Sequence, residues 1–271
     1  MEKFQRNERI AALTKILSDA PCKVFTLGSF SEMFSSAKST ISEDIDILRC
    51  VFERFGVGNI ETIPGASGGI RFIPSMSDSR KKDILESLCL DLSKSERILP
   101  GGYLYMLDII YNPEKISAIG CLFATYFIDS GIDYVITVET KGIPIALSTA
   151  RFLNVPLVIA RHYSEATDGN SVNINYVSGS SKKIQTMALS LKAVKRNSRL
   201  LFIDDFMKGG GTAKGIIELA KEFECEIAGI GVLVETLEPS KKLVDKYIPL
   251  LTLKKVDEEK GIIDINPAQK V

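Results

Sequence analysis

Apolar positions recur at helical spacing through the first 56 residues. Ile10, Leu13 and Leu17 predict a helix over Arg9–Asp19, and a short second helix is expected over Ser29–Phe34. The next apolar positions are spaced by 4, 3, 4 and 3 residues, which predicts the buried stripe of a third, longer helix: Ile41, Ile45, Leu48, Phe52 and Phe55. Gly56 is the expected stop of this helix.

Two alternating strings follow the third helix. GNIETIP and GGIRFIP flank the Gly-rich stretch PGASGG, which predicts a two-stranded hairpin with a loose tip. Helix, short helix, long helix and hairpin form the order of a winged helix-turn-helix domain, which we assign to residues 1–74. In that architecture the third helix enters the major groove with its N-terminal residues at the base edges.

Small hydrogen-bond donors and one cation mark the start of the third helix. The predicted DNA-binding residues are Ser36, Lys38, Ser39, Thr40 and Ser42 on this helix, with Gly68, Gly69 and Arg71 on the wing. Thr40 with Glu43 also fits a capping box. Residues 1–74 hold nine Lys/Arg and nine Asp/Glu, so charge does not favour DNA over a protein-binding or dimerisation module. DNA binding requires three acids, Glu43, Asp44 and Asp46, to face away from the duplex.

Residues 75–271 alternate β-branched runs with helical patterns, after a polar linker at Pro74–Asp83. Strands are expected at Tyr134–Glu139, Pro156–Ala160, Arg199–Asp204, Glu226–Glu235 and Leu250–Leu253. Helices are expected at Pro113–Asp129, Ile143–Leu153, Thr212–Phe223 and Pro239–Lys246. This alternation predicts an α/β domain with a mostly parallel sheet, whose ligand binds beyond the carboxyl ends of the strands.

The first strand end with candidate chemistry reads VETKGIPIA. Thr140, Lys141 and Gly142 form a turn before a helix, where backbone N–H groups and one cation can meet a diphosphate. The alternative is a turn with no ligand.

The second strand end reads LFIDDFMKGGGT. Asp204 and Asp205 follow a buried strand, and two adjacent acceptors suit the vicinal hydroxyls of a ribose. The amides of Gly209–Gly211 can surround a phosphate at the start of the next helix, which Thr212 is expected to cap. The alternative is a strand-to-helix turn with acidic caps.

Composition limits the kinds of catalytic and metal site that the chain can contain. The chain has 271 residues, a net charge of zero, five scattered cysteines and one histidine, which argues against His-based zinc sites and Ser-His-Asp triads. No apolar run reaches the roughly 20 residues of a membrane span, and the N-terminus MEKFQRNERI lacks a signal-peptide core. We therefore expect a cytoplasmic protein without a membrane partner and without a metal site of its own.

The string around Asp204 and Asp205 resembles the phosphoribosyl-diphosphate (PRPP) motif of type I phosphoribosyltransferases, and Val138–Ala146 is similar to their diphosphate loop. Among these enzymes, IDDF and AGIGVLVE resemble xanthine phosphoribosyltransferase. The whole chain resembles the purine operon regulators of Gram-positive bacteria, through SAKSTISED, ERILPGGYLY, NYVSGSSKKIQTM and DDFMKGGGT. That resemblance implies a homodimeric repressor or activator that binds double-stranded DNA at purine genes and uses a phosphoribosyltransferase-like domain to sense PRPP.

The resemblance also implies the effector site. Its residues are Tyr103, Thr140, Lys141, Gly142, Asp204, Asp205, Phe206, Met207, Lys208, Gly209, Gly210, Gly211 and Thr212. In the family, guanine nucleotide alarmones compete with PRPP at this pocket. No cofactor is obligatory, and whether Mg²⁺ accompanies PRPP is left open.

Lys208 argues against catalysis. Hypoxanthine-guanine enzymes of this class carry an aspartate there that takes the base proton, and adenine and orotate enzymes carry a small residue. A charged lysine cannot act as the base and fills the space. We therefore expect no catalytic residue and a sensor, with an active xanthine-type phosphoribosyltransferase as the alternative. Lys182 and Lys183 are further candidates for contact with the diphosphate.

Overall fold

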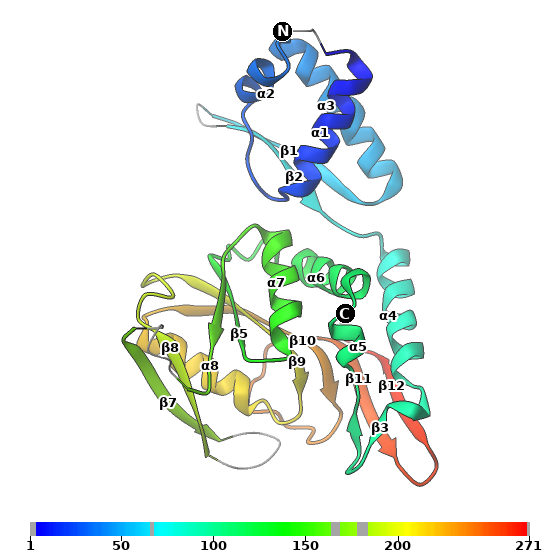
Figure 1. Ribbon diagram of the computed structural model, residues 1–271, viewed down its shortest axis with the longest axis vertical. Helices are drawn as coiled ribbons and strands as arrows, with labels where there is room; N and C mark the ends of the chain where they lie inside the picture. The colour runs from blue at the N-terminus through cyan, green and yellow to red at the C-terminus, as the bar shows by residue number, and fades with distance from the viewer. Residues whose placement is uncertain (1–3, 66–67, 164–168, 178–183, 270–271) are drawn as a thin grey trace. The chain divides into compact units, whose positions relative to one another are not determined.

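The computed structural model describes residues 4–65, 68–163, 169–177 and 184–269 (Figure 1). The chain divides into two compact units, the first formed mainly by residues 1–78 and the second by residues 79–150 and 155–271. Across the described ranges, no helix is long and apolar enough to cross a membrane.

The first unit has the element order of a winged helix-turn-helix. Its helices are α1 (Arg6–Asp19), α2 (Leu27–Met33) and α3 (Lys38–Phe55), and its strands are β1 (Gly58–Ile63) and β2 (Gly69–Pro74). The strands pair antiparallel, and Phe25 forms an additional bridge with Ile70. This order matches the one predicted from the hydrophobic pattern.

The core of this unit is the stripe on α3, with one correction. Ile41, Ile45, Leu48 and Phe52 are at most 5% exposed, but Phe55 is 71% exposed. Phe52 meets Phe72 of β2 edge to face at 4.9 Å between ring centroids, which closes the core one turn before Phe55. The spacing therefore predicted one buried position too many.

The ends of α3 are set by its backbone. Gly56 follows the helix in the left-handed region, with φ 59°, as expected for a helix stop. The predicted capping box at Thr40 is wrong, because α3 begins at Lys38 and its N-cap, Ala37, offers no side-chain acceptor. Thr40 lies inside the first turn, so no side chain caps the first amides of α3.

The second unit is built on a six-stranded sheet in the order β12-β11-β10-β9-β5-β6. Its strands are β5 (Tyr134–Val138), β6 (Leu157–Ala160), β9 (Arg199–Met207), β10 (Glu226–Thr236), β11 (Ile248–Asp257) and β12 (Ile262–Pro267). Neighbouring strands run parallel except β11 and β12, which form an antiparallel edge. This arrangement confirms the predicted α/β class with a mostly parallel sheet.

Both faces of this sheet are covered (Figure 1). The covering elements are α6 (Pro113–Phe127), α7 (Gly142–Leu153), α8 (Gly211–Glu222) and the antiparallel hairpin of β7 (Ser171–Val177) and β8 (Ile184–Ser190). On the α6 face, a side chain at Gly231 would lie 2.7 Å from Phe123. On the opposite face, Tyr176, Met187, Phe202 and Ile216 join β7, β8, β9 and α8 in one apolar cluster.

Several segments depart from the predicted order, and strands β7, β8 and β12 were not predicted. The linker is half helical, because α4 (Asp78–Leu92) begins within it, followed by a short helical turn at Ser95–Arg97. The predicted helix Pro239–Lys246 is absent, since this segment forms bends that attach to the loop after β9. A small hairpin of β3 (Ile98–Leu99) and β4 (Tyr103–Leu104), followed by α5 (Leu107–Ile110), was not predicted.

Candidate functional site

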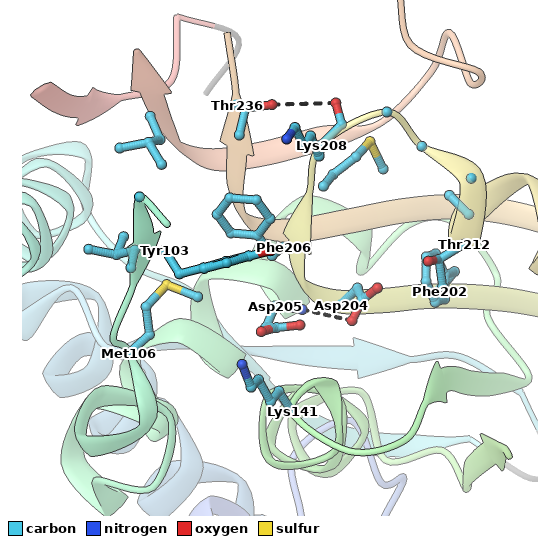
Figure 2. Close-up of a pocket in the computed structure, with 18 of the residues that line it drawn as sticks. Tyr103, Met106, Lys141, Phe202, Asp204, Asp205, Phe206, Lys208, Thr212 and Thr236 are labelled. Carbon is cyan, nitrogen blue, oxygen red and sulfur yellow. Dashed lines mark hydrogen bonds between the residues drawn. The ribbon is translucent and has the colours of Figure 1, made fainter. Parts of the chain in front are cut away.

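A cavity of about 480 Å³ lies in the second unit, where β9 and β10 end (Figure 2). Three segments contribute most of its wall: the β3–β4 hairpin, the end of β9 and the loop into α8. Its lining residues are Gly101, Gly102, Tyr103, Leu104, Met106, Lys141, Phe202, Asp204, Asp205, Phe206, Met207, Lys208, Gly209, Gly210, Gly211, Thr212, Ala213, Thr236 and Leu253. The cavity therefore occupies the position expected for a ligand of a parallel sheet.

Two adjacent carboxylates form the floor of the cavity at the end of β9. The backbone N–H of Asp205 donates to Oδ1 of Asp204 at 2.9 Å, which orients the Asp204 carboxylate. Burial and the charge of Asp205 raise the pKa of Asp204 well above the ordinary aspartate value. Burial also raises the pKa of Asp205, against the opposing effects of its hydrogen bond with Asp204 and the charge of Lys141. Within the described residues, neither carboxylate is hydrogen-bonded to a cationic side chain, and two such buried acceptors suit a ligand that donates hydroxyl groups.

Lys141 approaches these carboxylates from the turn after β5. Figure 2 shows its side chain directed toward Asp205, and its charge lowers the pKa of that residue. Gly142, the next residue, has no room for a side chain, since an added Cβ would lie 2.4 Å from Oγ1 of Thr137 and 2.9 Å from Oδ1 of Asp204. This close approach of the turn to β9 explains the glycine and places a cation beside the acidic floor.

The loop from Lys208 to Thr212 joins β9 to α8. Gly210 is in the left-handed region, with φ 79°, and serves as the N-cap residue of α8 without a side-chain cap. The expectation that Thr212 caps this helix is therefore wrong, because Thr212 lies in the first helical turn. Its side chain is next to Tyr176 of β7. Successive glycines before an uncapped helix start leave N–H groups available to an anion.

The β3–β4 hairpin forms the opposite wall, and we call Ile98–Leu104 the hood. Tyr103 at its end is 69% exposed and lines the cavity together with half-buried Phe206. Arg97 anchors the base of the hood through a bidentate pair with Asp108 at 2.6 and 2.7 Å. Its guanidinium also donates to the carbonyls of Asp91 at 2.6 Å and Tyr105 at 3.1 Å. A buried arginine with four such bonds fixes the hood relative to α4 and α5.

The structure brings together most of the residues expected in the effector site. Tyr103, Lys141 and every residue from Asp204 to Thr212 line the cavity, whereas Thr140 and Gly142 lie next to Lys141 without lining it. The sequence interpretation missed Gly101, Gly102, Leu104, Met106, Phe202, Ala213, Thr236 and Leu253. The pair Gly101-Gly102 in ERILPGGYLY was the one signal that could have indicated the hood. Lys182 and Lys183 lie outside the described residues.

No group of three or more His, Cys, Asp or Glu side chains that could hold a metal ion occurs within the described ranges. Among the described residues that line the cavity, the anionic side chains are those of Asp204 and Asp205. A divalent cation at this site would therefore arrive with a polyphosphate and complete its coordination with ligand oxygens and water.

The residues predicted to contact DNA lie in the first unit. Lys38, Ser39 and Ser42 are exposed on the first turns of α3, and Thr40 is half-buried. Ser36 is engaged in the turn between α2 and α3, where its hydroxyl donates to the Phe34 carbonyl at 3.0 Å. The three exposed residues form the accessible part of the predicted recognition surface.

The wing residues differ in their accessibility. Gly69 is buried, and an added Cβ would lie 2.1 Å from the carbonyl oxygen of Phe25, so its place in the hairpin is set by packing. Gly68 is half-buried at the described edge of the tip. Arg71 donates to Oε2 of Glu61 across the hairpin at 2.6 Å. A phosphate that binds Arg71 must therefore share it with Glu61.

Three acids of α3, Glu43, Asp44 and Asp46, lie beside arginines. Asp44 is fully buried, and its Oδ2 accepts from Nε of Arg9 at 2.7 Å, while its Oδ1 lies 3.3 Å from Nε of Arg6. Asp46 pairs with Arg49, and Glu43 lies 3.8 Å from Arg6. This arrangement neutralises the acids that a DNA-binding surface could not tolerate unpaired.

Replacement of Asp204 by asparagine is expected to stabilise the unliganded protein at neutral pH. Asn keeps an oxygen to accept from the Asp205 N–H but removes a charge that burial disfavours. Because the raised pKa makes the folded state bind more protons than the unfolded state, wild-type stability falls as pH rises from the ordinary aspartate range through the raised value. We expect a rise in Tm of about 2–4 °C at pH 7, the scale of 1 kcal/mol in a domain of this size. Thermal unfolding across pH measures it, and parallel pH profiles of the two proteins would contradict the raised pKa.

Comparisons with known families divide the chain in two. Residues 5–74 match the family described as the bacterial purine repressor, N-terminal domain. Residues 108–267 match the phosphoribosyl transferase domain. The two matches correspond to the winged-helix elements and to the unit that contains the cavity.

Similar proteins cover nearly the whole chain. The purine biosynthesis transcriptional repressor PurR of Bacillus subtilis is 47% identical over 97% of this chain and 92% of its own length. The purine biosynthesis transcriptional activator PurR of Lactococcus lactis subsp. lactis is 40% identical over 97% of both chains. The xanthine phosphoribosyltransferase of Lactococcus lactis subsp. cremoris is 30% identical over 67% of this chain and 90% of its own. The crystal structure of adenine phosphoribosyltransferase from Thermoanaerobacter pseudethanolicus matches 62% of this chain and 99% of its own, with a TM-score of 0.54 and 17% identity, and so shares the fold.

Proposed function

The chain belongs to the family of PurR regulators of purine biosynthesis, and from this premise we propose that it is a DNA-binding transcription regulator of purine genes whose second unit senses PRPP without transferring it. The observation that carries the proposal is the cavity at the end of β9, which combines Asp204 and Asp205 with a glycine loop and Lys141. The first group suits ribose hydroxyls, the second a 5′-phosphate and the third a diphosphate.

Lys208 supports sensing over catalysis. Its side chain is exposed at the mouth of the phosphate loop. A charged ammonium cannot remove a proton from a nucleobase, whereas it can pair with the phosphates of PRPP or of a guanine nucleotide. Tyr103 and Phe206 offer aromatic surfaces to the base of such a nucleotide, which would compete with PRPP for the same cavity.

The first unit supplies the DNA-binding surface in this proposal. The exposed start of α3 presents Lys38, Ser39 and Ser42 together with amides that no side chain caps. Such amides and hydroxyls donate to phosphate oxygens, and a helix start favours an anion. One winged helix makes a small interface, so we propose that a homodimer reads paired half-sites in the cytoplasm, where bacterial DNA lies.

The proposal is tested by fluorescence anisotropy of purine-gene control DNA with the full chain at fixed salt, with and without PRPP. The same samples are assayed for PRPP consumption in the presence of xanthine, hypoxanthine, guanine or adenine. We expect specific binding that PRPP alters, without turnover. The direction of the change is part of the result, because the similar proteins include a repressor and an activator.

The alternative is a purine phosphoribosyltransferase with an accessory N-terminal unit. The similarity to xanthine phosphoribosyltransferase over 67% of the chain makes xanthine the expected substrate in this alternative. Turnover with xanthine in the assay above, without specific DNA binding, would favour it.

Lys38→Glu is expected to weaken DNA binding about tenfold at moderate salt, because it replaces an exposed cation on the first turn of α3 with a charge that repels phosphate. The slope of log affinity against log salt should also become shallower. PRPP affinity should not change. Lys195→Glu, at an exposed position in the second unit, makes the same charge change and serves as the control. Equal DNA affinity of the two variants would move the recognition surface away from the start of α3.

A further inference from the structure

A buried lysine contacts the loop that lines the cavity without lining the cavity itself. Lys242 is 9% exposed, in the bent segment that follows β10. Its Nζ donates to the carbonyl of Lys208 at 2.7 Å and to the carbonyl of Thr236 at 2.6 Å, with Oγ1 of Thr236 at 3.4 Å. The ammonium therefore bridges the phosphate loop to the end of β10.

The charge of Lys242 is not neutralised by a direct ion pair within the described part of the chain. Glu235 instead accepts from the hydroxyls of Tyr247 and Thr252, and Glu238 accepts from the backbone N–H of Ser240. Burial lowers the pKa of Lys242, while the more distant charges of Glu235 and Glu238 oppose this shift. A buried cation held mainly by carbonyls leaves a positive potential at the back of the loop.

Leu243, the residue after Lys242, also contacts the loop, through its backbone. The backbone N–H of Leu243 donates to the carbonyl of Gly209 at 2.9 Å. A side chain at Gly210 would lie 3.2 Å from that same nitrogen. Two successive carbonyls of the loop, those of Lys208 and Gly209, thus both point at the segment Lys242–Leu243.

This orientation determines where the loop amides point. In a trans peptide the C=O and N–H bonds are antiparallel. The N–H groups of Gly209 and Gly210, on the far sides of the two anchored peptides, are therefore directed away from Lys242. Gly209 and Gly210 both line the cavity. A cation bound to the carbonyl of a peptide also polarises it and strengthens its N–H as a donor.

We propose that Lys242 is a positioning residue for the phosphate monoester subsite of this cavity, holding the amides of Gly209 and Gly210 toward a 5′-phosphate that it does not itself touch. The inference rests on the proposed function for the identity of the ligand. It adds that the subsite recognises the 5′-phosphoryl end shared by PRPP and 5′-phosphorylated nucleosides, and that its affinity depends on a charge outside the cavity.

The test uses the full chain with Lys242→Met and Lys242→Gln, and with Lys241→Met at the exposed neighbouring position as the control. Calorimetry with ribose 5-phosphate, PRPP and inorganic pyrophosphate measures each affinity. We expect both Lys242 variants to bind ribose 5-phosphate and PRPP about tenfold more weakly, the scale of one charge-assisted hydrogen bond. Pyrophosphate, which meets Lys141 in the proposed site, should bind as tightly as in the wild type.

The pattern across ligands separates positioning from folding. Lys242→Gln retains N–H donors for the carbonyls and removes the charge, so it tests the inference even where Lys242→Met fails to fold. Ribose 5-phosphate affinity equal to that of the Lys241→Met control, or an equal loss for all three ligands, would overturn the positioning role. Failure of the wild type to bind ribose 5-phosphate and PRPP would overturn the proposed function with it, so the two failures are distinguishable.

Discussion

Replacement of Asp205 by alanine is expected to abolish the response to PRPP while leaving DNA binding intact. Asp205 lies on the floor of the cavity next to Lys141 and has no cationic hydrogen-bond partner of its own within the described structure. In the proposed complex its carboxylate accepts from a ribose hydroxyl. Each charge-assisted hydrogen bond that is lost contributes about 1.5–3 kcal/mol, so we expect PRPP to bind about tenfold to hundredfold more weakly for each such bond. The anisotropy titration with PRPP measures this change directly.

Asp245→Ala is the matched control for Asp205→Ala. It removes the same charge from an exposed position of the second unit. Its PRPP response should equal that of the wild type, and both variants should bind DNA equally well without PRPP. A retained PRPP response in Asp205→Ala would contradict the assignment of the ribose site.

Asp44→Ala is expected to destabilise the first unit by about 3–5 kcal/mol, because it leaves the guanidinium of Arg9 buried without its carboxylate. The pair joins α1 to α3, so specific DNA binding should fall with the loss of structure. Hydrogen exchange followed by mass spectrometry measures the effect without a fluorescent probe, which suits a chain with no tryptophan. We expect faster exchange in α1 and α3 and unchanged exchange in the sheet of the second unit.

Two further variants separate the buried charge from other effects of Asp44→Ala. Asp46→Ala breaks the pair with Arg49 at the surface, where the Asp46 side chain is 63% exposed, and should cost at most about 1 kcal/mol. The double replacement Arg9→Met with Asp44→Leu removes both charges and should recover much of the lost stability. Protection of α3 in Asp44→Ala equal to that in Asp46→Ala would contradict the role of the buried pair.

The sequence predicted those parts of the fold whose cause is local. The stripe on α3, the stop at Gly56 and the strand that contains Asp204 and Asp205 depend on spacing and on backbone freedom, which can be read residue by residue. The strand itself continues to Met207, three residues beyond its predicted end. Phe55 was misassigned because periodicity does not report where the opposing surface ends. The segment Pro239–Lys246 has helical spacing, but its carbonyl-bound Lys242 ties it to a loop more than 30 residues earlier.

The sequence predicted some of the residues that line the cavity and missed others. Lys141 and Asp204–Thr212 carry recognisable chemistry in short strings. Gly101, Met106, Thr236 and Leu253 enter the cavity only because the hood and the strand ends meet in space. Contacts between segments that are distant in the sequence cannot be predicted from local patterns. The contact of Lys242 with the loop is of the same kind.

The anchoring of the hood by Arg97 has a mechanical consequence. Arg97 binds the carbonyl of Asp91 near the end of α4 and, through Tyr105 and Asp108, the residues just after the hood. The helix α4 has 15 residues, or about 22 Å at 1.5 Å per residue, and it starts at Asp78, where the first unit ends. A hood that shifts around its ligand must either break the bonds of Arg97 or move the C-terminal end of α4, which holds Asp91, with it.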